Sequence, residues 1–145
     1  MDTFILQLNE IINEFQAKRL QAIDWDIKPL PGKWSNKEIV GHLIDSAMIN
    51  LQRFIRCTYE ENFRLTYEQE TWVTVQNYQE SDIGDIIDLW TLINKQIIKV
   101  LTNYPLNRLE ARCDNSKIEP NLQSVTWLVN DYLGHLKHHI NQIKQ

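Results

Sequence analysis

Three of the four histidines of this 145-residue chain lie close together near its end, in the stretch D-Y-L-G-H-L-K-H-H-I-N-Q-I. His135 and His139 are four residues apart, so on a helix they are stacked one turn apart on the same face. This is the spacing by which a helix offers two imidazoles to one metal ion. His138 projects further round the helix, toward solvent, and is not expected to join them.

Two imidazoles alone do not define a metal site. A helix C-terminus favours positive charge, so histidines near it are also typical of an ordinary helix end. The fourth histidine, His42, lies in E-I-V-G-H-L-I-D-S, at the edge of the apolar side of its own helix. That position suits a ligand in a cleft and a surface histidine equally well. If a metal is bound, nitrogen ligands without nearby thiolates favour zinc, nickel or ferrous iron over calcium or magnesium.

Four amphipathic helices are expected to position these histidines. Apolar side chains recur at helical spacing in residues 2–22, 35–57 and 82–101, and again from about residue 124 onward. The second helix has the clearest start, because Ser35 and Glu38 have the spacing of a capping box. We therefore predict an all-α four-helix bundle that forms a single domain over residues 1–145.

The long connections allow more than one topology. Helices two and three, and helices three and four, are each separated by about twenty residues, enough to cross the bundle. Residues 71–75, T-W-V-T-V, alternate as a strand does, but they lack a partner strand and are interpreted as part of an ordered crossover. The first of these connections is rich in aromatic residues, which could pack over the bundle, roof a cleft or form an interface with a second copy. They are Phe63, Tyr67, Trp72 and Tyr78.

Composition excludes several classes of protein. The net charge of −4 and the scattered lysines and arginines argue against binding to nucleic acid. The chain has no apolar run long enough to span a membrane, and its first residues, M-D-T-F-I-L-Q-L-N-E, have no basic region typical of a secretory signal. Cys57 and Cys113 lie far apart in the sequence and have no metal-like spacing. We expect a cytoplasmic protein with reduced, unreactive thiols.

Two stretches of the chain resemble one known family. P-G-K-W-S-N-K-E-I-V-G-H-L-I-D-S-A-M-I-N-L-Q-R-F resembles the second helix of the DinB-like, damage-inducible four-helix metal-binding superfamily, and D-Y-L-G-H-L-K-H-H-I-N-Q-I resembles its last helix. The order and spacing agree across nearly the whole chain. The resemblance implies an up-down-down-up bundle with a long crossover between helices two and three, usually a homodimer. It also implies that His42, His135 and His139 hold a divalent metal: zinc or nickel first, with iron or manganese as alternatives.

The expected chemistry follows from the same resemblance. Three imidazoles leave a coordination position open, as catalytic sites do. Some DinB-like proteins join a low-molecular-weight thiol such as bacillithiol to an electrophile, and others are regarded as metal-dependent hydrolases. The resemblance therefore implies a metal-dependent thiol S-transferase or hydrolase acting on a small molecule. The alternative is a non-catalytic helical bundle that binds a small ligand or a partner, with the metal structural or absent.

Polar residues of the last helix are candidates for supporting the ligands or contacting substrate. Tyr132 shares the face of His139 and could aim its hydroxyl into a cleft. Asp131 lies four residues before His135 but leans outward. Gln142 could line the mouth of the cleft or belong to a solvated helix end.

The second helix contributes two further candidates. Asn50 interrupts the apolar side of that helix, and Arg53 is predicted to lie near His42. A satisfied polar residue at the rim or in the core is the alternative for both, as it is for Tyr132 and Asp131. Asp45 points away from the apolar side and is expected to be solvated.

Overall fold

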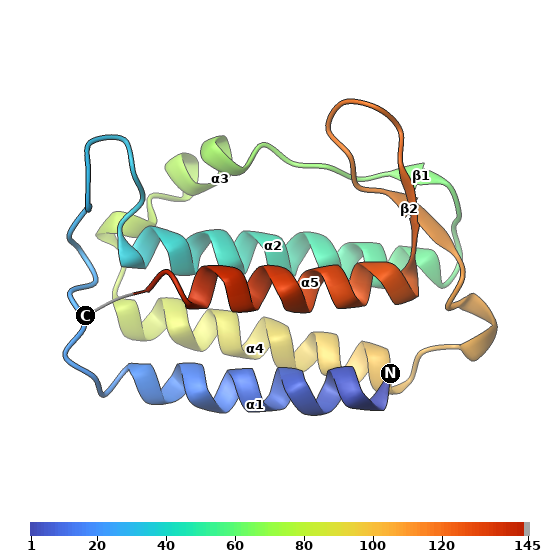
Figure 1. The fold of residues 1–145 in the computed structure, drawn as a ribbon, viewed down its shortest axis with the longest axis horizontal. Coiled ribbons are helices and arrows are strands. Elements are labelled where there is room, and N and C mark those ends of the chain that lie inside the picture. The colour runs from blue at the N-terminus through green and yellow to red at the C-terminus, as the bar shows by residue number, and fades with distance from the viewer. Residues whose placement is uncertain (144–145) are drawn as a thin grey trace.

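Four long helices lie side by side along the molecule (Figure 1). The computed structural model describes residues 1–143, and its long helices are α1 (Asp2–Lys18), α2 (Asn36–Cys57), α4 (Ile83–Thr102) and α5 (Val125–Ile140). Figure 1 shows that α1 and α5 run in one direction while α2 and α4 run in the other. The predicted four-helix bundle with up-down-down-up topology is therefore confirmed.

The start of α2 is fixed by the capping box that the sequence predicts. Ser35 Oγ accepts a hydrogen bond from the backbone N–H of Glu38 at 3.1 Å, and Glu38 Oε2 accepts one from the backbone N–H of Ser35 at 2.8 Å. Asp82 caps α4 and Ser124 caps α5 in the simpler way, through a side-chain oxygen that accepts a backbone N–H of the first turn. These caps place the predicted helix starts correctly.

The end of α1 differs from the prediction. The helix stops at Lys18 rather than near residue 22, and Leu20, which lies within the predicted helix, is 90% exposed. The chain turns away from the bundle here, so no neighbouring helix is left to bury this leucine.

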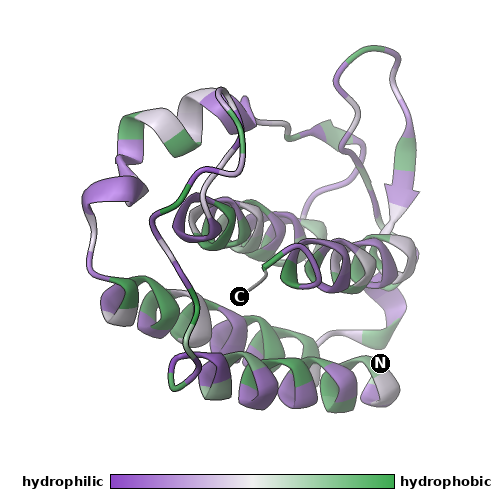
Figure 2. Ribbon diagram, turned by 60° about the vertical axis from the view of Figure 1, so that its left-hand side comes forward, coloured by the Kyte–Doolittle hydropathy of each residue, from purple (hydrophilic) through white to green (hydrophobic). Residues whose placement is uncertain are grey.

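The apolar stripes of the four helices meet in one core. Figure 2 shows hydrophobic and hydrophilic residues on different sides of the helices. Trp90 of α4 is fully buried and packs edge-to-face on Phe15 of α1, with ring centroids 4.7 Å apart. Within residues 1–143, no helix is both long enough and apolar enough to cross a membrane.

The crossover between α2 and α4 is ordered, as predicted, but it contains a helix where the sequence alternates like a strand. It holds β1 (Phe63–Arg64), α3 (Gln69–Gln76) and the 3-10 turn η1 (Tyr78–Glu80), and it returns along α2 (Figure 1). Val73 of α3 is buried, whereas Val75 is 76% exposed. The alternation in residues 71–75 therefore does not reflect a sheet, because packing of one face of α3 on α2 decides the local structure.

A small sheet joins the two long connections, which the sequence analysis did not foresee. β1 pairs in parallel with β2 (Arg112–Asp114), and β2 pairs antiparallel with β3 (Leu122–Ser124). Strands of two or three residues are too short to produce a period in the sequence.

The aromatic residues of the crossover pack on the bundle. The Tyr78 ring lies against Gly41 of α2, where a Cβ would overlap the ring. Phe63 lies under the guanidinium of Arg56 at 4.0 Å, and Tyr67 contacts Trp72 edge-to-face. The crossover therefore packs over the bundle, which is one of the arrangements that the sequence left open.

Candidate metal centre

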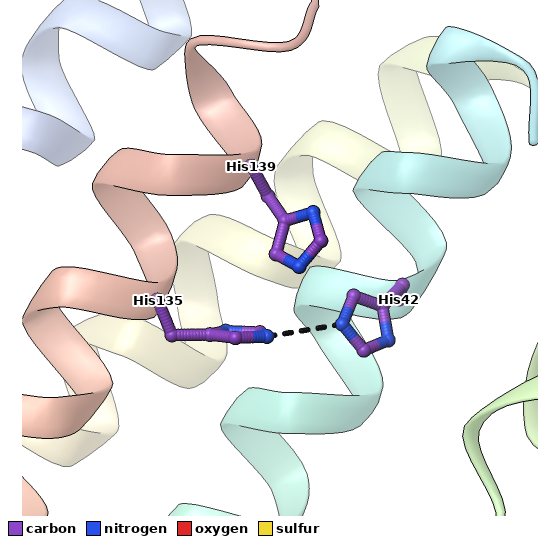
Figure 3. A group of neighbouring side chains, drawn as sticks. All are labelled: His42, His135 and His139. Atoms are coloured by element: carbon purple, nitrogen blue, oxygen red, sulfur yellow. Dashed lines mark hydrogen bonds between the residues drawn. The ribbon is translucent and has the colours of Figure 1, made fainter.

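The histidines predicted to act together converge between α2 and α5 (Figure 3). His42 comes from the second turn of α2, and His135 and His139 come from successive turns near the end of α5. One nitrogen from each ring lies within 4.8 Å of those of the other two. His42 Nε2 and His135 Nε2 are only 3.0 Å apart. His138 is exposed on the outside of the helix, as predicted.

In two of these rings the Nδ1 atom, which faces away from the cluster, lies within hydrogen-bond distance of a side-chain oxygen. His139 Nδ1 lies 2.9 Å from Gln142 Oε1, and His135 Nδ1 lies 3.3 Å from Ser46 Oγ. An imidazole that donates its Nδ1–H to such an oxygen has a free lone pair on Nε2. His139 is thereby oriented with Nε2 available to the centre of the cluster, because Gln142 Oε1 only accepts. The Ser46 hydroxyl can donate or accept, so it orients the His135 ring in either tautomer.

Burial keeps all three imidazoles neutral. It lowers the pKa of His42 to about 3, and the nearby rings of His135 and His139 lower it further. The pKa of His135 falls to about 4, again chiefly through burial, and burial also lowers the pKa of His139. The uncharged imidazole, which these pKa values favour at neutral pH, is the form that binds a metal ion.

This donor set fits a divalent cation. Imidazole nitrogens bind zinc at about 2.0–2.1 Å, so the ligands of one ion lie on the order of 3–4 Å apart. The nitrogens of His42 and His135 lie 3.0 Å apart, and those of all three histidines lie within 4.8 Å of one another, so a small adjustment of the rings would bring them round one ion. Two Nε2 lone pairs at 3.0 Å also repel each other unless a proton or a cation lies between them. Three nitrogens without a thiolate suit zinc, nickel or ferrous iron.

Aromatic rings cover one side of the cluster. The Trp34 ring, from the loop before α2, lies 4.8 Å from the His42 ring, centroid to centroid. The Tyr67 ring, from the crossover, stacks on the His42 ring with centroids 6.4 Å apart, and it contacts Trp72. The crossover thus covers His42 with the Tyr67 ring, and this apolar surface limits the access of water to His42.

A groove of about 500 Å³ adjoins the histidines. Two of its lining residues contact them directly, since Trp34 packs on His42 and Gln142 accepts from His139. Its other walls combine apolar, polar and charged groups, including Ile39, Lys33, Gln69 and Glu70. This is the size of a typical small-molecule pocket. Gln142 lines this groove and is exposed, which agrees with both positions predicted for it.

The two candidates on α5 do not reach the histidines. Tyr132 is buried, and its hydroxyl donates to Asn94 Oδ1 at 2.6 Å, between α5 and α4. Burial raises the pKa of this hydroxyl. The idea that it points into the cleft was wrong, because Asn94 gives it a partner inside the core. Asp131 is exposed, as its outward position predicted.

Asn50 and Arg53 reach the histidines only through Ser46. Arg53 Nη1 donates to Asn50 Oδ1 at 3.2 Å, and Asn50 Nδ2 donates to the Ser46 carbonyl at 2.9 Å. Arg53 also donates to the carbonyl of Leu65, so it fastens the crossover rather than lying beside His42. Ser46 was missed, although its place one turn after His42 could have indicated it.

Asp45 is buried rather than solvated, so that prediction was wrong. The crossover covers this side of α2, and both the Tyr78 hydroxyl and the Gln76 side-chain amide donate to Asp45 Oδ1. Burial raises the pKa of the Asp45 carboxyl, although these two hydrogen bonds oppose the rise. The sequence could not reveal this, because the covering residues lie more than thirty positions further along the chain.

Fold and site together define a four-helix bundle with a three-histidine cluster shared by two helices. The chain belongs to the DinB superfamily, whose model matches residues 10–143. A search of curated proteins finds no match.

Solved structures share this fold. YfiT from Bacillus subtilis, described as a probable metal-dependent hydrolase with an unusual four-helix bundle topology, has a TM-score of 0.85 and 20% identity, over 98% of this chain and 82% of YfiT. A mycothiol-dependent maleylpyruvate isomerase has a TM-score of 0.77 and 7% identity, over 98% of this chain and 60% of the isomerase, so this chain spans less than two thirds of that enzyme. The DinB-like protein YjoA from Bacillus subtilis has a TM-score of 0.61 and 14% identity, over 97% of this chain and 84% of YjoA.

Proposed function

We propose that this protein is a metal-dependent enzyme that acts on a small molecule, as a thiol S-transferase or a hydrolase. His42, His135 and His139 are the proposed metal ligands. The observation that carries the proposal is the convergence of three neutral imidazoles from two helices beside a groove of about 500 Å³. A structural site usually closes with four protein ligands, whereas three ligands leave room for a reactant.

His42, His135 and His139 would hold a divalent cation, which would lower the pKa of a water or thiol toward neutrality and so supply the nucleophile for either reaction. The chain's own residues prepare this site. Ser46 and Gln142 orient the rings of His135 and His139, while Trp34 and Tyr67 shield His42 from water. The groove at Trp34 and Gln142 is the proposed place for the substrate.

A thiol transferase of this kind would take its thiol from a substrate. Cys57 and Cys113 are both fully buried. Burial raises the pKa of Cys57 to about 12 and also raises that of Cys113. Neither cysteine forms a thiolate readily near neutral pH, so neither is suited to be the nucleophile.

The relatives support both reaction classes. YfiT is described as a probable metal-dependent hydrolase, and the isomerase is mycothiol-dependent, so a small thiol takes part in its reaction. Their identities to this chain are 20% and 7%, so these descriptions motivate the assays but do not choose between them.

The test begins with metal content, measured by mass spectrometry on the purified protein. The metal-loaded protein is then given a low-molecular-weight thiol with an electrophile and, separately, an activated ester. We expect turnover in one assay that requires the metal and disappears in the His42→Ala and His139→Ala variants. Full turnover in both variants would overturn the proposal.

The non-catalytic alternative predicts a different pattern. An ion that only ties α2 to α5 would raise the melting temperature without supporting turnover of either substrate class. Melting curves with and without a chelator, run beside the two assays, therefore distinguish a structural ion from a catalytic one.

Assembly as a homodimer, inferred from the family resemblance, stays a prediction. Sedimentation at micromolar concentration that shows a monomer would contradict it.

A further inference from the structure

Two buried polar atoms on neighbouring positions of α2 have no hydrogen-bond partner among residues 1–143. They are His42 Nδ1 and Asp45 Oδ2. The side chains are 1% and 0% exposed. Residues three apart on a helix are neighbours on its surface, so the two atoms belong to one region of the interior. Buried polar groups in proteins are normally paired, directly or through an ordered water.

The two atoms are chemically complementary. His42 Nε2 faces His135 Nε2, and an imidazole with a free lone pair on Nε2 carries its proton on Nδ1, where it is a donor. A carboxylate oxygen such as Asp45 Oδ2 is an acceptor only. One water molecule can accept from the first and donate to the second.

In the other two histidines of the cluster, the Nδ1 atom has an oxygen partner, which His42 lacks. The outer nitrogen of His135 has Ser46 Oγ, and that of His139 has Gln142 Oε1. A histidine that binds metal generally donates its second N–H to a carboxylate, a carbonyl or water, and this bond fixes both tautomer and ring orientation. Only His42 lacks such an oxygen within direct reach.

We propose that Asp45 is the positioning residue of His42, and that its Oδ2 receives the Nδ1–H of His42 through one buried water. This bond keeps the Nε2 lone pair of His42 turned toward the cluster. The metal-binding part of the inference rests on the proposed function, but the tautomer part does not.

The crossover holds Asp45 in this role. Tyr78 and Gln76 both donate to Oδ1, which leaves Oδ2 as the oxygen free to serve His42. The Tyr78 ring also lies on Gly41, the residue before His42. The segment from α3 to η1 is therefore coupled to the orientation of a histidine that it does not bind directly.

The decisive variant is Asp45→Asn. The Gln76 amide N–H needs an acceptor and the Tyr78 hydroxyl donates to the same atom, so we expect the amide oxygen of the variant in the place of Oδ1 and its NH₂ group in the place of Oδ2. An NH₂ group only donates, and the bridging water then donates to His42 Nδ1. His42 must place its proton on Nε2, which blocks the nitrogen that faces the cluster.

Nitrogen-15 NMR of the histidine rings in the metal-free protein reads this tautomer directly. We expect His42 protonated on Nδ1 in the natural sequence and on Nε2 in Asp45→Asn, with zinc affinity reduced about 10- to 100-fold. An unchanged His42 tautomer in the variant would overturn the inference. If the natural protein binds no ion, the proposed function fails, yet the tautomer comparison still decides the role of Asp45.

A second variant covers the case in which Asp45→Asn does not fold. Tyr78→Phe keeps the ring on Gly41 but removes one hydrogen bond to Asp45, and we expect a several-fold loss of zinc affinity. Tyr104→Phe is the matched control, since this buried hydroxyl donates to the Phe54 carbonyl in the core. Equal zinc affinities in the two variants would contradict the coupling.

Discussion

His42 Nε2 lies 3.0 Å from His135 Nε2, although 93 positions separate the two residues in the chain. Neutral imidazoles at that distance either share a proton or turn two lone pairs toward one another. The low pKa values of both rings disfavour an added proton. The pair can therefore share a neutral N–H···N hydrogen bond, and it has the geometry to hold a cation between the two nitrogens.

Replacement of His135 should remove metal binding. His135→Ala leaves His42 and His139 as ligands, and we expect the metal content to fall from about one ion per chain to a small fraction of that. Elemental analysis after dialysis measures it. His138→Ala is the control, because His138 is exposed and outside the cluster; its metal affinity should change less than tenfold. Equal losses in the two variants would argue against the assigned ligands.

The metal-free protein should lose stability as the pH falls below about 6.5. In the unfolded chain His42 and His135 take up protons near pH 6.5, whereas in the folded chain their pKa values are about 3 and about 4. The unfolded state binds more protons in this interval, so acid favours unfolding by up to about 1.4 kcal/mol per pH unit for each histidine.

Urea melts at pH 7.5, 6.5 and 5.5 measure this slope. The His135→Ala variant should show a shallower dependence, since one of the two histidines is gone. A slope that is identical in the two proteins would contradict the assignment of the pH effect to this cluster.

Gly41→Ala should destabilise the protein. A Cβ at this position overlaps the Tyr78 ring, which must shift and thereby strain its hydrogen bond to Asp45. We expect a loss of about 1–3 kcal/mol in the free energy of unfolding. Gly134→Ala on α5 is the matched control, because a Cβ there meets nothing within 4 Å. That change should raise stability by up to about 1 kcal/mol, since alanine is the better helix former.

Tyr132→Phe should separate core stability from metal binding. The change leaves the buried Asn94 Oδ1 without its hydrogen bond from the hydroxyl, which costs about 1–3 kcal/mol of stability. Zinc affinity, followed by competition with a chromogenic chelator, should stay within a factor of two or three. A large loss of zinc affinity in a folded variant would indicate that Tyr132 contributes to the metal site after all.

The parts of the fold that depend on local pattern could be predicted from the sequence. The Ser35–Glu38 capping box and the spacing of His135 and His139 act within a few residues, and both are found as expected. The place of His42 could not be derived from periodicity, which left it at the edge of its helix. The family resemblance supplied that information.

The errors share one physical cause, which is burial by a distant segment. The sequence around Asp45 predicts a solvated helix residue, but in the structure Gln76 and Tyr78 of the crossover cover its side chain. The helical position of Tyr132 suggests a cleft residue, but in the structure its hydroxyl donates to Asn94 of α4 inside the core. The helix α3 was hidden in a strand-like pattern because its packing on α2, rather than its own period, decides its conformation.

The crossover is fastened to the rest of the molecule on both sides of Tyr67. On one side β1 pairs with β2 and Arg53 donates to the Leu65 carbonyl, while on the other side the Tyr78 ring packs on Gly41. The segment between these contacts carries Tyr67 and Trp72 and is fixed to the molecule at both ends. These contacts keep the Tyr67 ring beside His42, so the cover over this histidine depends on residues at both ends of the crossover.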